Sequence, residues 1–100
     1  MRIIAVSTLK AFWENSPAYM EARPSLLAWH RFTLKADWAS PADLKKDFRS
    51  ASILQAGRVI FNIAGNKYRL VVKINYPHRV VYIRFVGTHA QYDVIDAQTI

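Results

Sequence analysis

Hydrophobic and polar residues alternate along three stretches between residues 58 and 88, and this alternation predicts three antiparallel strands. Successive side chains of a strand point to opposite faces of a sheet, so every second residue shares a face. One parity is almost entirely apolar and is predicted to face the core: Phe61, Ile63, Leu70, Val72, Ile74, Val81, Ile83 and Phe85. A shift of register by one residue would bury arginines and expose these side chains, so the pattern indicates which face meets solvent.

The other parity combines cations with an aromatic side chain. From the middle and last strands it collects Arg69, Val71, Lys73, Val80, Tyr82, Arg84 and Val86. We expect these residues to form a basic, uncovered face of the sheet. The connections fit this arrangement, because Ala64-Gly65-Asn66 tolerates positive φ and Tyr76-Pro77-His78 contains a preset proline turn.

A short strand and a helix are predicted at the amino terminus. Residues 2–6, RIIAV, form a β-branched run that can add one strand to the sheet. Ser7 is a suitable N-cap for a helix that extends to about Asn15, in which Leu9 and Phe12 recur at helical spacing.

Two further helices are predicted before the three strands. One lies within residues 17–35, where Pro24 either opens the helix proper or kinks a longer one. The next begins at Ser40, because serine caps helices well, Pro41 suits the first helical position, and an acid follows at the third. Residues 49–57, RSASILQAG, are expected to form a polar connection into the sheet.

The predicted order of elements is β-α-α-(short α)-β-β-β, in one domain that spans residues 1–100. This order predicts an α+β fold, a two-layer sandwich in which helices cover one face of an antiparallel sheet. A chain of 100 residues, of which 52% are hydrophobic, is sufficient for one core.

The charge of the chain indicates its class of partner. Fourteen Lys and Arg against seven Asp and Glu give a formal net charge of +7 and a pI near 10.1. Such a protein is expected to bind a polyanion, whether nucleic acid, an acidic protein or an anionic membrane surface. The alternative is that the charge only maintains solubility.

There is no cysteine, which excludes disulfides and thiolate chemistry. No signal-peptide pattern or run of eighteen apolar residues is present, so we expect a cytoplasmic protein without a membrane partner.

Arginine, histidine and tyrosine side chains are the candidates for chemistry. Arg84 lies on the last predicted strand, and His89 and Tyr92 follow in THAQYD, where they share a face if the segment makes a helical turn. Each also has a structural interpretation. Arg84 can be a solvated sheet residue, His89 a turn or capping residue, and Tyr92 a tyrosine at the edge of the core. No metal site is predicted, because the three histidines stand apart from other ligand types. A glycine-rich phosphate loop and a serine elbow are absent as well.

Two blocks of the chain carry a family resemblance. They are FNIAGNKYRL at residues 61–70 and YIRFVGTHAQYD at residues 82–93, and the amino-terminal half follows the same family's order of elements. The chain resembles the HigB-type toxins of bacterial toxin–antitoxin pairs, a branch of the RelE-like mRNA interferases. The resemblance implies a RelE-like fold and a small endoribonuclease that cuts mRNA on the ribosome. It also implies silencing by a cognate helix-turn-helix antitoxin of the HigA type.

The resemblance further implies a site. Its functional positions fall on Arg69, Arg84, His89 and Tyr92, with Asn66 and Lys67 at the adjoining turn. We predict RNA-binding roles for Asn66, Lys67, Lys73 and Tyr82. In this hypothesis the 2′-hydroxyl of the RNA attacks the neighbouring phosphate, without a metal or small-molecule cofactor. The two arginines bind the scissile phosphate, and the histidine and tyrosine transfer protons.

Two other functions fit the same residues. A non-catalytic nucleic-acid-binding module would use the arginines, lysines and tyrosines for phosphate contacts and base stacking, and would bind message without cutting it. A basic partner-binding protein would dock an acidic helix and show no affinity for RNA.

Overall fold

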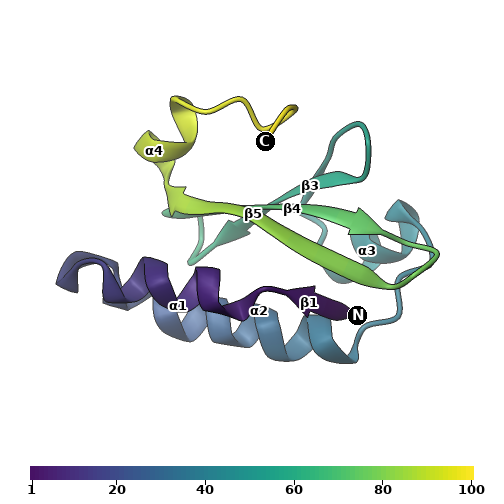
Figure 1. The fold of residues 1–100 in the computed structure, drawn as a ribbon, viewed down its shortest axis with the longest axis horizontal. Helices are drawn as coiled ribbons and strands as arrows, with labels where there is room; N and C mark the ends of the chain where they lie inside the picture. Colours follow the sequence, from purple (N-terminus) through teal and green to yellow (C-terminus); the bar gives the residue numbers. More distant parts are fainter.

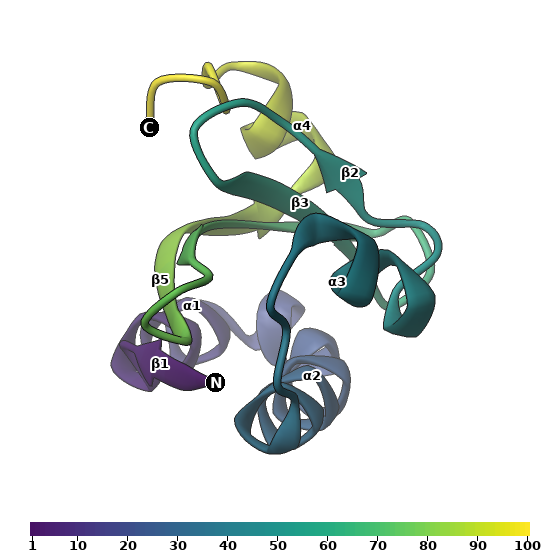
Figure 2. The same ribbon diagram turned by 90° about the vertical axis from the view of Figure 1, so that its right-hand side faces the viewer.

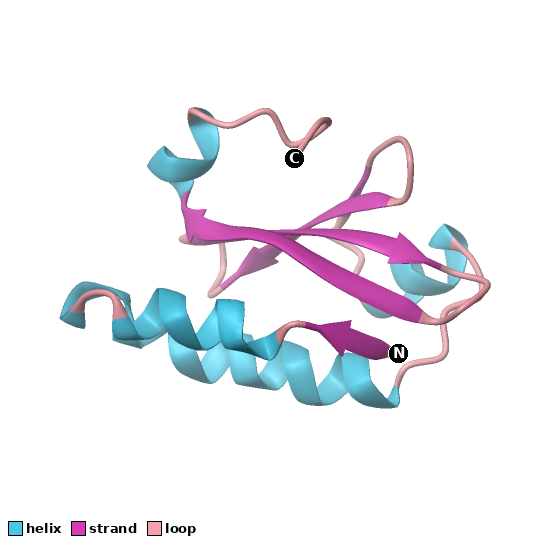
Figure 3. Cartoon of the chain, viewed as in Figure 1, coloured by secondary structure: helices cyan, strands magenta, loops and turns pink.

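The computed structural model describes all 100 residues and contains a five-stranded sheet with helices on both sides (Figures 1 and 3). The strands are β1 (Arg2–Ile4), β2 (Ser52–Ile53), β3 (Arg58–Ile63), β4 (Tyr68–Asn75) and β5 (Val80–Thr88). Their order in the sheet is β1-β5-β4-β3-β2. Neighbouring strands are antiparallel except β1, which pairs in parallel with β5. The sheet is therefore mixed, whereas a wholly antiparallel sheet was predicted.

Three helices and a 3-10 helix precede most of the sheet, and one short helix follows it. They are α1 (Val6–Glu14), the 3-10 helix η1 (Pro17–Ala22), α2 (Arg23–Lys35), α3 (Pro41–Asp47) and α4 (His89–Asp93). Figures 1 and 2 show α1 and α2 side by side along one face of the sheet, with α4 on the opposite side. None of these helices combines the length and apolar character that a membrane span requires. The predicted α+β fold is confirmed, and α4 is an addition to the face that was expected to be bare.

The helix boundaries follow local sequence signals with one exception. Ser40 caps α3 as predicted, because its Oγ accepts a hydrogen bond from the Asp43 amide at 3.3 Å. Pro24 lies in the first turn of α2, after η1, so it opens this helix and does not kink a longer one. The predicted N-cap Ser7 is wrong, since α1 starts at Val6 and the N-cap is Ala5, the residue that follows β1.

The segment predicted to be a polar connection, residues 49–57, contains β2. Ser52 and Ile53 pair with β3, and the Leu54 amide donates to the Arg58 carbonyl at 2.8 Å. A polar sequence can form this strand because it needs only one partner and lies exposed at the edge of the sheet.

The main core lies between the sheet and the first three helices. Leu9, Leu26 and Leu44 come from α1, α2 and α3, and all three are fully buried. The sheet contributes Val59, Phe61, Ile63, Leu70, Val72, Ile74, Val81 and Ile83 to the same cluster. The alternation of the sequence therefore predicted this face correctly up to Ile83.

A β-bulge changes the two faces in the last part of β5. Val72 pairs with Ile83 and Val71 pairs with Phe85, which leaves Arg84 as an extra residue in β5. The prediction that Phe85 faces the main core is therefore wrong. Beyond the bulge the alternation is reversed, and Phe85 lies on the opposite face.

A second, smaller hydrophobic cluster covers the centre of that opposite face. Its buried members are Ile60, Val71 and Ala97, with Leu54, Phe85, Tyr92 and Ile95 packed against them. The chain after α4 crosses the sheet here, and the Arg58 Nε donates to the Ile100 carbonyl at 3.0 Å. Val86, predicted to face outward, packs against the main core instead, because of the bulge. The face predicted to be uncovered is therefore covered at its centre by the chain after α4, and basic residues lie at its two ends.

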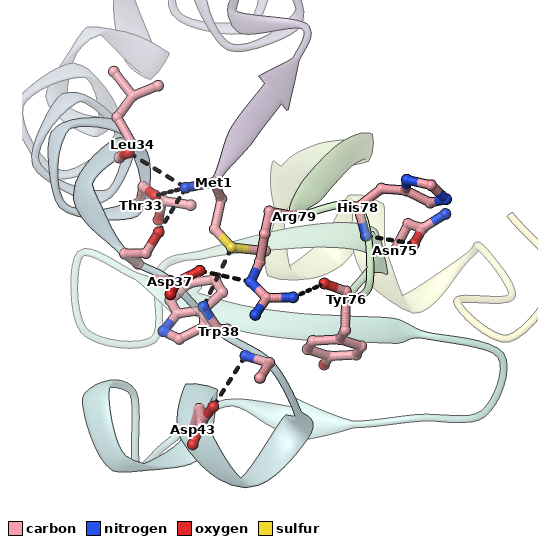
Figure 4. A network of polar contacts seen from close by, with 12 residues as sticks. Met1, Thr33, Leu34, Asp37, Trp38, Asp43, Asn75, Tyr76, His78 and Arg79 are labelled. Atoms are coloured by element: carbon pink, nitrogen blue, oxygen red, sulfur yellow. Dashed lines mark hydrogen bonds and ion pairs between the residues drawn. The ribbon is translucent and has the colours of Figure 1, made fainter.

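A polar network fixes the end of the sheet that is far from α4 (Figures 1 and 4). The amino group of Met1 donates to three carbonyls at the end of α2, of which that of Ala36 is nearest at 2.6 Å. In the β4–β5 turn, Arg79 donates to the Tyr76 carbonyl, and its Nε lies 2.6 Å from Asp37 Oδ1. These contacts tie the turn and the first strand to the segment after α2.

Candidate functional site

Arg69, His89 and Tyr92 come together at the edge where β4 begins and β5 ends. Arg69 Nη2 lies 2.6 Å from His89 Nε2. The Arg69 guanidinium also lies over the Tyr92 ring, with its carbon 6.0 Å from the ring centroid. The register of the sheet explains the meeting, because Arg69 is paired with Gly87, two residues before His89. The structure thus joins three of the four predicted catalytic residues in one group, called here the Arg69 cluster.

The contact between Arg69 and His89 indicates which histidine nitrogen carries a proton. A guanidinium can only donate hydrogen bonds, so His89 Nε2 must accept one. A neutral His89 then carries its proton on Nδ1, which lies 3.6 Å from Asp93 Oδ1. The imidazole therefore lies between a cation and a carboxylate, and its side chain is 52% exposed. Asp93 was not among the predicted site residues, although its spacing of four residues from His89 on a helix is a signal for this contact.

Two local features allow α4 to follow β5 without a linker. A Cβ at Gly87 would lie 2.5 Å from Phe85 Cζ and 2.8 Å from Gln91 Oε1, so any larger residue would force these two side chains to shift where α4 folds back. Thr88 and Gln91 form a capping box, in which Thr88 Oγ1 accepts from the Gln91 amide (3.2 Å) and Gln91 Oε1 accepts from the Thr88 amide (2.8 Å). The T-x-x-Q spacing of such a box is visible in the sequence. It positions His89 at the start of the helix.

The 3-10 helix η1 supports the Arg69 cluster from a distant part of the sequence. Gln91 Nε2 donates to the Tyr19 hydroxyl at 3.1 Å, which holds α4. The Tyr68 hydroxyl donates to Glu21 Oε1 at 2.9 Å, which holds the start of β4. These partners lie 72 and 47 residues apart in the sequence. No local pattern predicts such contacts, so Tyr19 and Glu21 were not found from the sequence.

The contacts of Glu21 change two pKa values. The hydrogen bond from Tyr68 lowers the pKa of Glu21, and the nearby Lys67 lowers it further. Burial raises the pKa of the Tyr68 phenol, and its hydrogen bond to the Glu21 carboxylate adds to this effect. Both shifts favour the pair as found, an ionised carboxylate that accepts from a neutral phenol.

We expect Glu21→Gln to lower thermal stability at neutral pH and to weaken the dependence of stability on acid pH. A carboxyl whose pKa is lowered by folding stabilises the fold fully above its ordinary value of 4.5, and this contribution is lost as the pH falls through the lowered pKa. Unfolding midpoints of parent and variant, measured from about pH 3 to about pH 7, should converge toward acid. Glu14→Gln, an exposed glutamate at the end of α1, is the control. A difference between Glu21→Gln and parent that is constant over this range would contradict the assignment.

Asn66 and Lys67 lie at the turn beside the Arg69 cluster, but they contribute differently. The Asn66 carbonyl accepts from Arg69 Nη1 at 3.3 Å, so Asn66 helps to orient the guanidinium through its backbone. The Lys67 carbonyl accepts from the His89 amide at 3.2 Å. The Lys67 ammonium lies 3.4 Å from Glu21 Oε2, and both side chains are exposed. In the free protein this predicted RNA-binding lysine therefore already has a carboxylate partner.

The other predicted site residues line a separate groove of about 660 Å³. Lys73 and Tyr82 are paired across β4 and β5, and Arg84, the bulge residue, is part of the same wall. The contacts that join the Arg69 cluster do not involve Arg84. Arg84 is thus the one predicted catalytic residue that stands apart from the other three.

The structure contains no group of three or more His, Asp or Glu side chains that could hold a metal ion. His89 and Asp93 form a pair at the Arg69 cluster. His30 lies in α2 and His78 in the β4–β5 turn. The groups that the cluster itself presents are a guanidinium, an imidazole, a phenol and a carboxylate.

Comparisons with known proteins identify related sequences. Residues 22–95 match the family model HigB_toxin, described as the RelE-like toxic component of a toxin–antitoxin system. The chain is 29% identical over 92 residues to the "mRNA interferase toxin HigB" of Escherichia coli (strain K12), an alignment that covers 90% of this chain and 88% of that protein. Proteins named "mRNA interferase HigB" from Escherichia coli O157:H7 and Shigella flexneri match to the same extent. The matched region of the family includes the whole Arg69 cluster.

Proposed function

Because the chain belongs to the HigB toxin family, the RelE-like toxic components of toxin–antitoxin systems, we propose that it is a ribosome-dependent endoribonuclease that cuts translated mRNA. Relatives with this sequence pattern are named mRNA interferases. The observation that carries the proposal is the Arg69–His89 contact beside Tyr92, which combines a phosphate-binding cation with two groups able to transfer protons.

In the proposed mechanism the substrate phosphate exchanges partners with His89. A phosphate oxygen that accepts from Arg69 replaces His89 Nε2, which is the acceptor in the free protein. The imidazole nitrogen is then free to take the proton of the adjacent 2′-hydroxyl. Asp93, 3.6 Å from Nδ1, stabilises the imidazolium that results. Substrate binding itself would thus release the base.

The remaining steps follow from the 2′-hydroxyl attack. The deprotonated O2′ forms a bond to phosphorus, the bond from phosphorus to O5′ breaks, and the 5′ oxygen takes a proton. The products are a 2′,3′-cyclic phosphate and a 5′-hydroxyl, without a metal ion or other cofactor. Tyr92 is the proposed donor to the 5′ oxygen, because it is the second group of the Arg69 cluster that can transfer a proton and its half-buried ring lies beside the Arg69 guanidinium. Arg69 neutralises charge that grows on the phosphate.

Ribosome dependence is proposed from the openness of the Arg69 cluster. His89 is half exposed, and α4 is a helix of only five residues, none of them fully buried. A site of this kind positions a free RNA strand poorly, and orientation by a larger assembly supplies what it lacks. We further propose that the protein acts in the cytoplasm, where translated mRNA is found.

As a toxic component the protein has an antitoxin partner, which we propose to be a helix-turn-helix protein of the HigA type. With a net charge of +7, the chain favours an acidic partner segment. An antitoxin that covers the basic sheet face would block RNA and so silence the enzyme.

The direct test is to incubate the purified protein with ribosomes and a translated message. We expect cuts within the translated region, unaffected by a metal chelator at concentrations that leave the ribosomes intact, and a 3′ end blocked as cyclic phosphate. A free 3′-hydroxyl would require an activated water and would overturn this mechanism. Binding of message without any cut would favour a non-catalytic RNA-binding module, and no RNA affinity at all would favour a basic partner-binding protein.

A further inference from the structure

We infer that the groove beside Lys73 and Tyr82 is a second RNA subsite, which takes one base and a flanking phosphate of the strand that is cut at the Arg69 cluster. This inference rests on the proposed function, and it assigns Arg84 to the path between the two sites. Three observations support it: the composition of the groove, an unpartnered polar group on one of the residues that line it, and a second concavity that continues toward α4.

The groove has the size and the surface of a nucleotide site. Its volume of about 660 Å³ lies within the roughly 300–1,000 Å³ that is usual for ligand sites. Lys73 and Tyr82 lie opposite each other on β4 and β5, and Tyr82 is 37% exposed. Ile53 and Leu54 supply apolar wall on the side of β2. An accessible aromatic ring beside a lysine is the combination that stacks a base and binds its phosphate.

Tyr76, one of the residues that line this groove, carries an unpartnered polar group. Its hydroxyl is buried and has no hydrogen-bond partner within the protein. Figure 4 shows the Tyr76 ring directed away from the network that holds its own carbonyl. A buried hydroxyl without a partner is unfavourable, and a shift of the Tyr76 side chain toward the groove would let a polar atom of a bound base remove this penalty. Burial also raises the pKa of Tyr76, so the phenol stays a hydrogen-bond donor.

Arg84 connects this groove with the neighbourhood of α4. It lines the groove and also a second concavity of about 560 Å³, which has Asn15 and Tyr19 on one side and Gln91 on the other. The bulge in β5 places this additional cation between the two hollows. An RNA strand that follows β5 can therefore pass Arg84 on its way to α4 along Phe85 and Ile95, at the border of the second hydrophobic cluster, without crossing Ala97.

The spacing of the two sites suits a short strand. Lys73 lies four residues after Arg69 on β4 and on the same face of the sheet. At about 3.3 Å per residue the two positions are roughly 13 Å apart, a span that a few nucleotides can bridge. Bases bound in the groove would hold the strand in register while Arg69 holds the scissile phosphate.

The test uses an uncleavable, fluorescently labelled single-stranded oligoribonucleotide with 2′-O-methyl groups, and measures its binding by anisotropy. We expect Tyr82→Ala to weaken binding about 5- to 150-fold, since loss of one stacked base corresponds to about 1–3 kcal/mol at 1.4 kcal/mol per tenfold. Tyr82→Trp should retain affinity within a few-fold. Lys73→Ala should weaken binding and reduce the slope of log affinity against log salt by about one. Lys35→Ala, which removes an exposed lysine at the end of α2, is the charge-matched control and should bind as the parent does.

Cleavage assays separate this inference from the proposed function. In ribosome reactions, Tyr82→Ala should raise the protein concentration needed for half-maximal cleavage and leave the maximal rate unchanged. If the parent cuts message while Tyr82→Ala and Lys73→Ala match it in both binding and cleavage, the subsite is refuted and the nuclease stands. If the parent does not cut message but both variants lose oligonucleotide affinity relative to Lys35→Ala, the subsite stands and the nuclease is refuted. A parent protein that does not bind the oligonucleotide overturns the subsite.

Discussion

Replacement of His89 by glutamine should reduce ribosome-dependent cleavage by about 10²- to 10⁴-fold, the usual contribution of a general acid or base. Glutamine can still accept a hydrogen bond from Arg69, but it cannot take a proton from the 2′-hydroxyl. His89 is exposed, so the fold should not change. The rate of message cleavage at saturating protein measures the effect, and thermal unfolding verifies the fold. His78→Gln, the same substitution at an exposed histidine of the β4–β5 turn, should cut as the parent does.

Tyr92→Phe and Arg69→Ala complete this series. Tyr92→Phe keeps the ring under the Arg69 guanidinium and removes only the hydroxyl, so a loss of cleavage reports on the proton. Arg69→Ala should cost about 10²- to 10³-fold, as for other preorganised charge-stabilising donors. Ribosome binding should stay within a few-fold of the parent in the His89 and Tyr92 variants. Binding that falls in step with cleavage would make α4 a docking element, and cleavage that survives both changes would leave Arg69 as an electrostatic catalyst without a dedicated acid or base.

Phe61→Ala should lower the free energy of unfolding by about 3–5 kcal/mol, the range for truncation of a buried phenylalanine. Phe61 is 1% exposed and lies at the centre of the main core. Its ring centroid is 5.0 Å from that of Phe48, 5.4 Å from that of Trp29 and 6.4 Å from that of Trp38. No neighbouring backbone can fill such a cavity without disturbing the packing of α2 and α3. Denaturant unfolding followed by tryptophan fluorescence measures the loss.

Phe85→Ala is the informative comparison, since the β-bulge moves this residue out of the main core. Phe85 is half-buried in the second hydrophobic cluster, beneath the chain that follows α4. Its truncation should destabilise the protein less than Phe61→Ala. It should also loosen Tyr92, so cleavage should fall by more than the loss of folded protein explains. Equal losses of stability in the two variants, with cleavage unchanged in Phe85→Ala, would contradict the bulge assignment.

The sequence by itself determined the elements whose signals are local. The alternation along β3, β4 and the first part of β5 assigned Phe61, Val72 and Ile83 to the core, because side chains of a strand alternate strictly between two faces. Ser40 and Pro41 marked the start of α3 for an equally local reason, since a cap needs only its own helix. The resemblance of two sequence blocks indicated the family, which the match over residues 22–95 confirms.

Other features depended on contacts between segments that are remote in the sequence. The extra residue Arg84 reversed the alternation at Phe85, because a bulge depends on how β5 pairs with β4 and not on the β5 sequence alone.

Only the tertiary structure brought His89 Nε2 within 2.6 Å of Nη2 of Arg69, which lies twenty residues earlier in the chain. This contact determines which histidine nitrogen accepts the hydrogen bond. The supports from Tyr19 and Glu21 span still longer separations, and the chain after α4 covered a face that the pattern left bare. Each of these depends on the packing of segments that are remote in sequence, and the free energy of that packing is a property of the assembled fold.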